Sequence, residues 1–311
     1  MDYCNGCLKD NTKGFCSACE RLLFDRSKVS PQLKFNWEDI SKRIDGYPMG
    51  FSISGVQRKG FIGKPRGVEL LQKMDADEKS RYILKPMLSR FNLPDQSPAN
   101  EHLTMQIAKQ LFKIKIAECA FMNFANGTPA YITKRFDYDE NGDKRNQEDF
   151  VSVLQASHKY SSKTYQDVGE WLGPLNRVDL LRILIFNFLI GNGDAHLKNF
   201  SLLETADGDM MLSPSYDLMN TKIHLADNLL ALNLFNEFEQ TKLPLGEKYI
   251  YRSEDFIGFG KRLKIQDRII TGIIDSFDKK ESEILTMVDK SFLSDNARSL
   301  YKNNVIENYK L

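Results

Sequence analysis

The sequence carries almost no net charge, because 43 Lys and Arg residues oppose 42 Asp and Glu residues. This balance excludes a general electrostatic field that would attract nucleic acid or an anionic membrane, although local patches are still allowed. The sequence also lacks the charged, apolar and small-residue series of a signal peptide. Its most apolar segment, residues 178–190, is too short to span a bilayer. We therefore expect a cytoplasmic protein with no membrane partner.

Cysteine is scarce, with five in 311 residues, yet four of the five lie near the start of the chain. They follow the pattern C-x2-C-x8-C-x2-C, with ligand candidates Cys4, Cys7, Cys16 and Cys19. Two such pairs can supply four thiolates to a tetrahedral Zn2+. The alternatives are disulfides, which a reducing cytosol disfavours, or reduced cysteines without a ligand. We predict a structural zinc element over residues 1–24, because four Cys ligands leave no open position for catalysis.

The strongest candidate for a catalytic site follows the apolar segment that ends at Ile190. Asp194 and Asn199 stand five apart, as in the kinase catalytic loop, where the Asp accepts a hydroxyl proton and the Asn binds Mg2+. Asp217 is the candidate second Mg2+ ligand, because a hairpin around Asp207-Gly208 would return it to the loop. The alternative is a helix end followed by a surface hairpin.

Three weaker signals precede this loop. The glycine-containing stretch from Gly50 to Gly60 could approach a phosphate through backbone N–H groups, or it could be a plain hairpin. Lys85 at the end of a short strand could pair with phosphates, or it could be a solvated charge. Glu101, near the start of a helix that opens at Ser97, could orient Lys85, or it could only interact with the helix dipole.

The hydrophobic pattern predicts strands in the first half of the chain and helices after it. The expected strands are residues 81–86, 114–124 and 130–136. Further helices are expected at residues 147–156, 165–172, 178–190 and 296–309. At 311 residues, the chain is long enough for two lobes with a large core.

Seven motifs occur in a fixed order along residues 48–305: residues 52–59, Ile83-Leu84-Lys85-Pro86, Asn100-Glu101, Arg135-Phe136-Asp137, Gln147-Glu148-Asp149, residues 193–199 and Pro214-Ser215-Tyr216-Asp217. In this order the sequence resembles HipA-type serine/threonine kinases, the toxins of bacterial toxin-antitoxin modules. The resemblance implies an α+β, two-lobed, protein-kinase-like fold that binds ATP between its lobes. It also implies a strand-rich N-lobe over residues 25–137 and an all-helical C-lobe over residues 138–311, after the zinc element.

The resemblance also implies which residues bind the nucleotide. The loop over the ATP phosphates would consist of Ser54, Gly55, Val56, Gln57, Arg58 and Lys59. Lys85 would pair with the phosphates and Glu101 would orient it. The hinge beside adenine would consist of Lys134, Arg135 and Phe136, and Tyr216 is also expected at the nucleotide.

The catalytic residues follow from the same resemblance. Asp194 would be the catalytic base, and Asn199 and Asp217 would bind Mg2+. His196 and Lys198 would support the transferring phosphate. Ser52 aligns with the serine that such kinases autophosphorylate, and Ser54 gives the loop a second hydroxyl.

The implied substrate is a protein serine or threonine, on an aminoacyl-tRNA synthetase by family resemblance. The implied partner is a HipB-like helix-turn-helix antitoxin, and DNA would be contacted only through it. Larger family members carry an extra N-terminal subdomain, where this chain has the cysteine cluster, so a separately encoded small protein could supply it. Lys134 stands where a glutamate is typical. Two alternatives are a small-molecule phosphotransferase of the aminoglycoside type and a regulatory binding protein without turnover.

Overall fold

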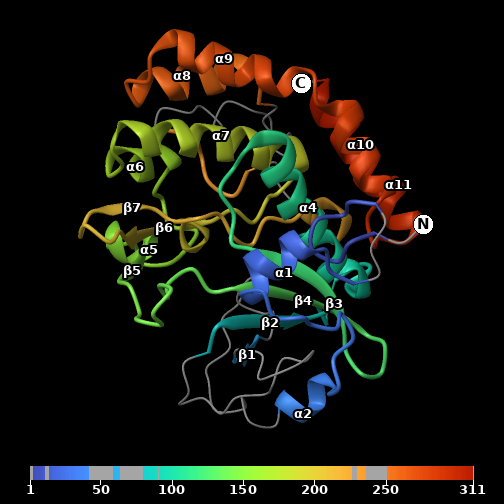
Figure 1. Cartoon of the computed structure of the whole chain (residues 1–311). Helices are drawn as coiled ribbons and strands as arrows, with labels where there is room; N and C mark the ends of the chain where they lie inside the picture. The colour runs from blue at the N-terminus through green and yellow to red at the C-terminus, as the bar shows by residue number, and fades with distance from the viewer. Residues whose placement is uncertain are drawn as a thin grey trace.

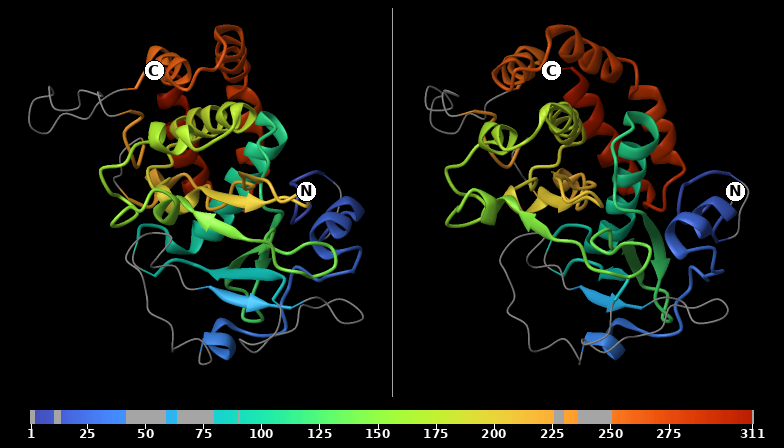
Figure 2. Two further views of the ribbon diagram at one scale, coloured as in Figure 1. Left: turned by 90° about the vertical axis from the view of Figure 1, so that its left-hand side faces the viewer. Right: turned by 60° about the vertical axis from the view of Figure 1, so that its left-hand side comes forward.

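The computed structural model describes residues 3–10, 14–41, 59–63, 80–89, 91–225, 230–235 and 251–310. A sheet-containing lobe lies below a larger, mostly helical lobe in Figure 1, and a side view shows the same two parts (Figure 2). The α+β, kinase-like class expected from the sequence is therefore confirmed. Most of the expected phosphate loop lies outside the described residues, namely Ser52, Ser54, Gly55, Val56, Gln57 and Arg58.

The first lobe is organised around an antiparallel, four-stranded sheet with strand order β1-β2-β4-β3. Its strands are β1 Gly60–Ile62, β2 Tyr82–Pro86, β3 Cys119–Asn123 and β4 Pro129–Lys134. Residues 114–117, which were predicted to extend β3, have other partners. The Ile114 N–H bonds to Ala108 at the end of a helix, and the Ala117 N–H bonds to Ser215. The strand therefore begins only at Cys119.

The two faces of this sheet belong to two different hydrophobic cores. Side chains alternate along a strand, so Ala120 and Met122 pack on one face while Cys119 and Phe121 pack on the other. The first face is covered by helix α1, Ser17–Phe24. The short helix α2, Trp37–Ser41, follows α1 in the chain. The second face joins the larger core of the helical lobe.

Helix α4, Ser97–Phe112, connects the sheet to the second lobe. It follows the short 3-10 helix η1, Pro94–Gln96, and ends where Lys113 adopts a left-handed conformation with φ of 57°. It packs against β3 and β4 on one side and against helical segments on the other. Because α4 is almost completely buried, the side chains on its first turns face other parts of the protein and not solvent.

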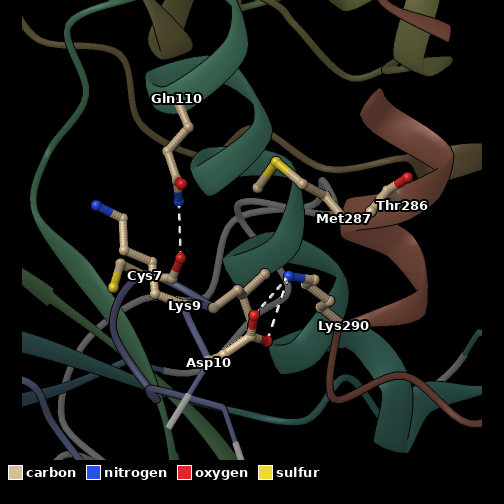
Figure 3. Close-up of a pocket in the computed structure, with 8 residues that line it drawn as sticks. Cys7, Lys9, Asp10, Gln110, Thr286, Met287 and Lys290 are labelled. Atoms are coloured by element: carbon tan, nitrogen blue, oxygen red, sulfur yellow. Dashed lines mark hydrogen bonds and ion pairs between the residues drawn. The ribbon is translucent and has the colours of Figure 1, made fainter. Parts of the chain in front are cut away.

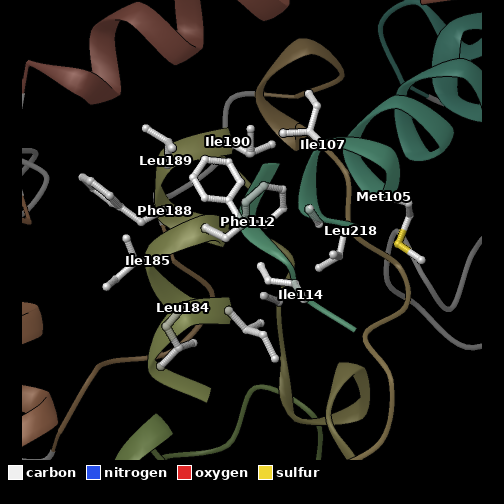
Figure 4. Close-up of a cluster of buried hydrophobic side chains, with 14 of the residues drawn as sticks. Met105, Ile107, Phe112, Ile114, Leu184, Ile185, Phe188, Leu189, Ile190 and Leu218 are labelled. Atoms are coloured by element: carbon white, nitrogen blue, oxygen red, sulfur yellow. The ribbon is translucent and has the colours of Figure 1, made fainter. Parts of the chain in front are cut away.

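The second lobe is mostly helical. Its helices are α5 Phe150–Val153, α6 Tyr165–Glu170, α7 Pro174–Ile190, α8 Ser253–Arg262, α9 Asp267–Asp278, α10 Glu281–Asp289 and α11 Asp295–Tyr309, with short 3-10 helices η2 Leu197–Asn199 and η3 Thr221–Ile223. Helix α7 is its central element. Apolar side chains of α7, such as Leu184 and Phe188, lie in the same buried cluster as Phe112 of α4 (Figure 4). Among the described residues, no helix has both the length and the apolar character to cross a membrane.

The expectation that the second lobe is all helical is wrong, because it contains an antiparallel, three-stranded sheet. Its strands are β5 Gln147–Asp149, β6 Ser201–Glu204 and β7 Met210–Leu212. The helix expected over residues 147–156 does not start before Phe150, since the Asp149 carboxylate caps α5 by accepting the Val151 N–H at 3.0 Å. The hairpin expected around Asp207-Gly208 is confirmed by the pairing of β6 with β7.

Candidate functional site

A buried lysine joins the two lobes at the candidate site. Lys85 lies on β2, opposite Tyr131 of β4. Its ammonium donates to Glu101 Oε1 of α4 at 2.7 Å and to Asp217 Oδ1. Lys85 is 6% exposed and Glu101 is 1% exposed. Lys85 is therefore not a solvated charge, and Glu101 orients the lysine from the neighbouring helix.

The charges of this trio depend on one another. Burial lowers the pKa of Lys85, but Asp217 and Glu101 outweigh burial and hold that pKa above its ordinary value. Burial raises the pKa of Glu101 to about 7, although Lys85 opposes the rise. Burial would also raise the pKa of Asp217, but Lys85 and Lys59 lower it overall. Asp217 is therefore ionised at neutral pH, and it shares the single ammonium with Glu101.

The segment that contains Asp194 is held rigidly at the end of α7. Gly191 closes the helix in a left-handed conformation with φ of 76°. The Gly193 N–H then bonds to Thr221 Oγ1 at 2.9 Å, and the Asp194 N–H bonds to Asn192 Oδ1 at 3.3 Å. Asp194 is 8% exposed. Its carboxylate is consequently presented by backbone that neighbouring residues fix in place.

Asn199 lies between the backbone of His196 and the side chain of Asp217. Its Oδ1 accepts the His196 N–H at 3.1 Å, and its Nδ2 donates to Asp217 Oδ2 at 3.4 Å. Asp217 has φ of 57°, in the left-handed region that costs a non-glycine residue about 1–3 kcal/mol. Mg2+ prefers oxygen ligands supplied by one or two carboxylates together with phosphates and water. The Asp217 carboxylate and the Asn199 amide oxygen fit that preference.

The aromatic pair Phe136 and Tyr216 lies beside this group. Their ring centroids are 5.7 Å apart, and the Tyr216 hydroxyl donates to the Lys198 carbonyl oxygen at 2.8 Å. The Lys198 side chain itself is exposed. Lys59, the one residue of the expected phosphate loop that lies within the described residues, is close enough to lower the pKa of Asp217. The structure therefore brings Lys59, Phe136 and Tyr216 to the same region as Asp217.

The side chains of Lys134 and Arg135, the other two residues of the expected hinge, have partners elsewhere. Lys134 Nζ donates to Asp25 Oδ1 at 2.6 Å, just beyond the end of α1, and to the carbonyl oxygen of Leu22 in its last turn at 3.1 Å. Arg135 forms a two-pronged ion pair with Asp137, with distances of 2.9 and 2.6 Å. Both side chains are therefore already paired with protein groups.

Two residues at the site were not anticipated from the sequence. The Tyr160 hydroxyl donates to Asp194 Oδ1, and the Tyr160 ring lies edge-on to His196 with centroids 5.1 Å apart. Lys159 precedes it in the chain. Neither residue lies at a motif spacing from Asp194, so only the fold reveals them.

The four N-terminal cysteines gather in one cluster. Their sulfur atoms all lie within 4.8 Å of one another. Gly6 permits this approach, because a Cβ there would lie 2.6 Å from the Cys19 sulfur. Cys4 Sγ also accepts the backbone N–H groups of Gly6 at 3.4 Å and Cys16 at 3.2 Å. Four sulfur donors at this spacing fit a tetrahedral Zn2+.

The four-cysteine element, residues 3–10 and 14–24, is docked on the lobes and does not stand apart. His102 Nε2 of α4 donates to the Gly6 carbonyl oxygen at 3.0 Å, and Gln110 Nε2 donates to the Cys7 carbonyl oxygen at 2.8 Å. Figure 3 shows the second contact and the ion pair of Asp10 with Lys290, beside a cavity of about 350 Å³. The cluster therefore lies against the helix that carries Glu101.

Buried neutral histidines predict a pH dependence of stability. Burial lowers the pKa of His102 to about 4 and of His196 to about 3, and it also lowers the pKa of His224. The unfolded chain binds protons below about pH 6.5 where the folded chain does not, so stability should fall as pH decreases from 7 to 5. Glu101, whose pKa is raised, opposes this trend. Urea unfolding at several pH values should show this decrease in the free energy of unfolding, and His224→Gln should make the decrease smaller. Equal stability at pH 5 and pH 7 would contradict the prediction.

Comparisons with known proteins agree with this geometry. The family described as HipA-like C-terminal domain matches residues 51–284. A "Putative kinase" of Haemophilus influenzae is 24% identical over 332 residues, which cover 94% of this chain and 92% of that protein. A second "Putative kinase", from Sinorhizobium fredii, is 30% identical over 211 residues, and the match spans 62% of this chain and 49% of that protein.

A solved structure supports the fold. The Shewanella oneidensis complex of HipA with HipB and operator DNA contains a chain with a TM-score of 0.63 and 21% identity, over 89% of this chain and 71% of that one. The four-cysteine element precedes the region matched by the family. Because that region is more than half of the chain, and because the two-lobed fold agrees with it, the protein belongs to the HipA-like C-terminal domain family.

Proposed function

We propose that the protein is a serine/threonine kinase that transfers the γ-phosphoryl group of Mg-ATP to a protein hydroxyl. The observation that carries this proposal is the buried contact of Lys85 with both Glu101 and Asp217. A lysine oriented by a helix glutamate, next to an aspartate suited to Mg2+, is the arrangement with which kinases bind ATP phosphates. In the proposed complex, a nucleotide bound between the two lobes would contact side chains from both.

The proposed reaction assigns a role to each polar group. The substrate hydroxyl oxygen attacks the γ-phosphorus, the bond to the bridging oxygen of ADP breaks, and the hydroxyl proton passes to Asp194. Asn199 and Asp217 would hold Mg2+, which neutralises developing charge when bound. Because burial lowers the pKa of His196 to about 3, the imidazole is neutral at physiological pH. His196 therefore acts through hydrogen bonding and packing, and not as a charged donor.

The proposal extends to regulation and partners. Phosphorylation of Ser52 or Ser54 would place negative charge in the loop that Ser54–Lys59 would form over the ATP phosphates, so the chain would silence itself. The Shewanella oneidensis structure contains HipB and operator DNA. By analogy we propose that a HipB-like helix-turn-helix antitoxin is the partner of this protein, and that DNA is contacted only through it. We also propose that a separately encoded small protein supplies the extra N-terminal subdomain, and that the substrate is an aminoacyl-tRNA synthetase. We also propose that the chain divides into the zinc element, the N-lobe and the C-lobe after residues 24 and 137.

Lys85→Met tests the nucleotide site. We expect phosphoryl transfer to fall by about 10²-fold or more, because the phosphates lose a preorganised cation. The variant also leaves two buried carboxylates without their ammonium, so its melting temperature should fall. Binding of Mg-ADP should therefore be measured well below that temperature, together with the transfer rate from labelled ATP.

Lys279→Met is the matched control, since Lys279 is an exposed lysine at the end of α9. It should keep the wild-type rate. If Lys85→Met, while folded, transfers phosphate as fast as this control, the assignment of the nucleotide site is wrong.

A further inference from the structure

The segment that includes Lys159 and Tyr160 lies directly on the catalytic loop. The Leu197 N–H donates to the Lys159 carbonyl oxygen at 3.2 Å, which joins the two backbones. The Tyr160 hydroxyl donates to Oδ1 of Asp194, the residue proposed above as the catalytic base. The segment of Lys159 and Tyr160 therefore lies next to the proposed catalytic base.

The Lys159 ammonium has no hydrogen-bond partner among the described residues, although its nitrogen is buried. It lies over the face of the Tyr160 ring, 4.9 Å from the ring centre, where a cation is attracted to the π electrons. An ammonium removed from water without an acceptor is costly, so such groups are usually paired. A ligand with anionic oxygens would supply the missing acceptors.

Charged residues of the candidate site interact electrostatically with Lys159. Burial lowers its pKa, Asp194 and Asp217 oppose that shift, and Lys198 and Lys59 add to it. These four charged residues are the ones assigned above to the base, the metal and the phosphates. Lys159 therefore shares one electrostatic environment with the groups around the transferring phosphate.

We propose that Lys159 is a catalytic residue that binds the γ-phosphoryl group of the nucleotide. This inference rests on the proposed function. Lys85 is already shared by Glu101 and Asp217, so it cannot alone neutralise a triphosphate. As the bond from the γ-phosphorus to ADP breaks and the substrate oxygen bonds to phosphorus, Lys159 donates to a non-bridging oxygen. The hydroxyl proton still passes to Asp194, once the substrate hydroxyl has replaced that of Tyr160.

Lys159→Met separates this role from a structural one. In titrations with Mg2+ present, the wild type should bind the imido analogue of ATP more tightly than ADP, and the variant should lose that preference while its ADP affinity changes less than about twofold. The transfer rate should fall by about 10²–10³-fold, as for loss of one preorganised donor. Lys159→Arg should restore part of both.

Lys163→Met is the control, because Lys163 carries the same charge four positions along the same segment. It should behave as wild type. Lys159→Met with an unchanged rate and an unchanged preference would overturn the proposal, and so would an equal loss of affinity for ADP and the analogue. If the wild type transfers no phosphate but prefers the analogue through Lys159, the proposed function fails, and Lys159 binds the γ-phosphate without being a catalytic residue.

Discussion

Asp194→Asn should reduce phosphoryl transfer by about 10²–10⁴-fold, the usual contribution of a positioned general base. The amide has the shape of the carboxylate but cannot accept the substrate proton. Melting temperature should stay within a few degrees, since the amide oxygen can still accept from the Tyr160 hydroxyl that bonds to Asp194. The measurement is transfer of labelled phosphate to a protein substrate, or to the chain itself, together with a thermal melt.

Asp207→Asn provides the matched control, because it makes the same chemical change at an exposed turn between β6 and β7. This variant should retain full activity. Near-normal turnover by Asp194→Asn would show that the catalytic loop is wrongly assigned. The same assay separates an enzyme from a regulatory binding protein, which would have no activity for the substitution to remove.

The second large effect is expected at the cysteines. Metal analysis of the purified protein should find about one zinc per chain, and Cys4→Ser should lose it. Cys4 is the most buried of the four, at 0% exposure, and its sulfur accepts two backbone N–H groups. Since the bound metal contributes folding free energy directly, we expect the melting temperature to fall by roughly 10 °C or more.

Cys119→Ala is the control for this experiment. Cys119 is buried in β3, outside the cluster, so its loss should cost packing energy but no zinc. Protein prepared without chelator that contains no zinc, with all four N-terminal thiols free, would refute the metal site.

Local spacing explains what the sequence could reveal. Asp194 and Asn199 are five residues apart on one loop, so their relation is visible without a fold. The relation of Lys85 to Glu101 stayed open between two interpretations, because it depends on how a strand meets a helix. Lys159 could not be found at all. Its significance comes from burial without a hydrogen-bond partner, which is a property of the packed structure only.

The second sheet shows a different limit. Residues 147–149 were expected to be helical, yet Gln147 pairs with Leu203 across a long stretch of sequence. Strand pairing of this kind is decided by the partner, so propensity within the segment does not reveal it. The docking of the four-cysteine element on α4 was likewise missed, since backbone carbonyls form those contacts and their positions leave no mark in the sequence.

That docking would couple the two proposed ligands, zinc and nucleotide, which would not contact each other. His102 and Gln110 of α4 donate to the carbonyl oxygens of Gly6 and Cys7. Cys7 is one of the four cysteines, and Gly6 precedes it in the chain. Glu101 precedes His102, so a metal that fixes these carbonyls also favours the helix position in which Lys85 is paired. Binding free energies are reciprocal. Zinc and nucleotide should therefore bind cooperatively, and an excess of nucleotide should slow the removal of zinc by a chelator.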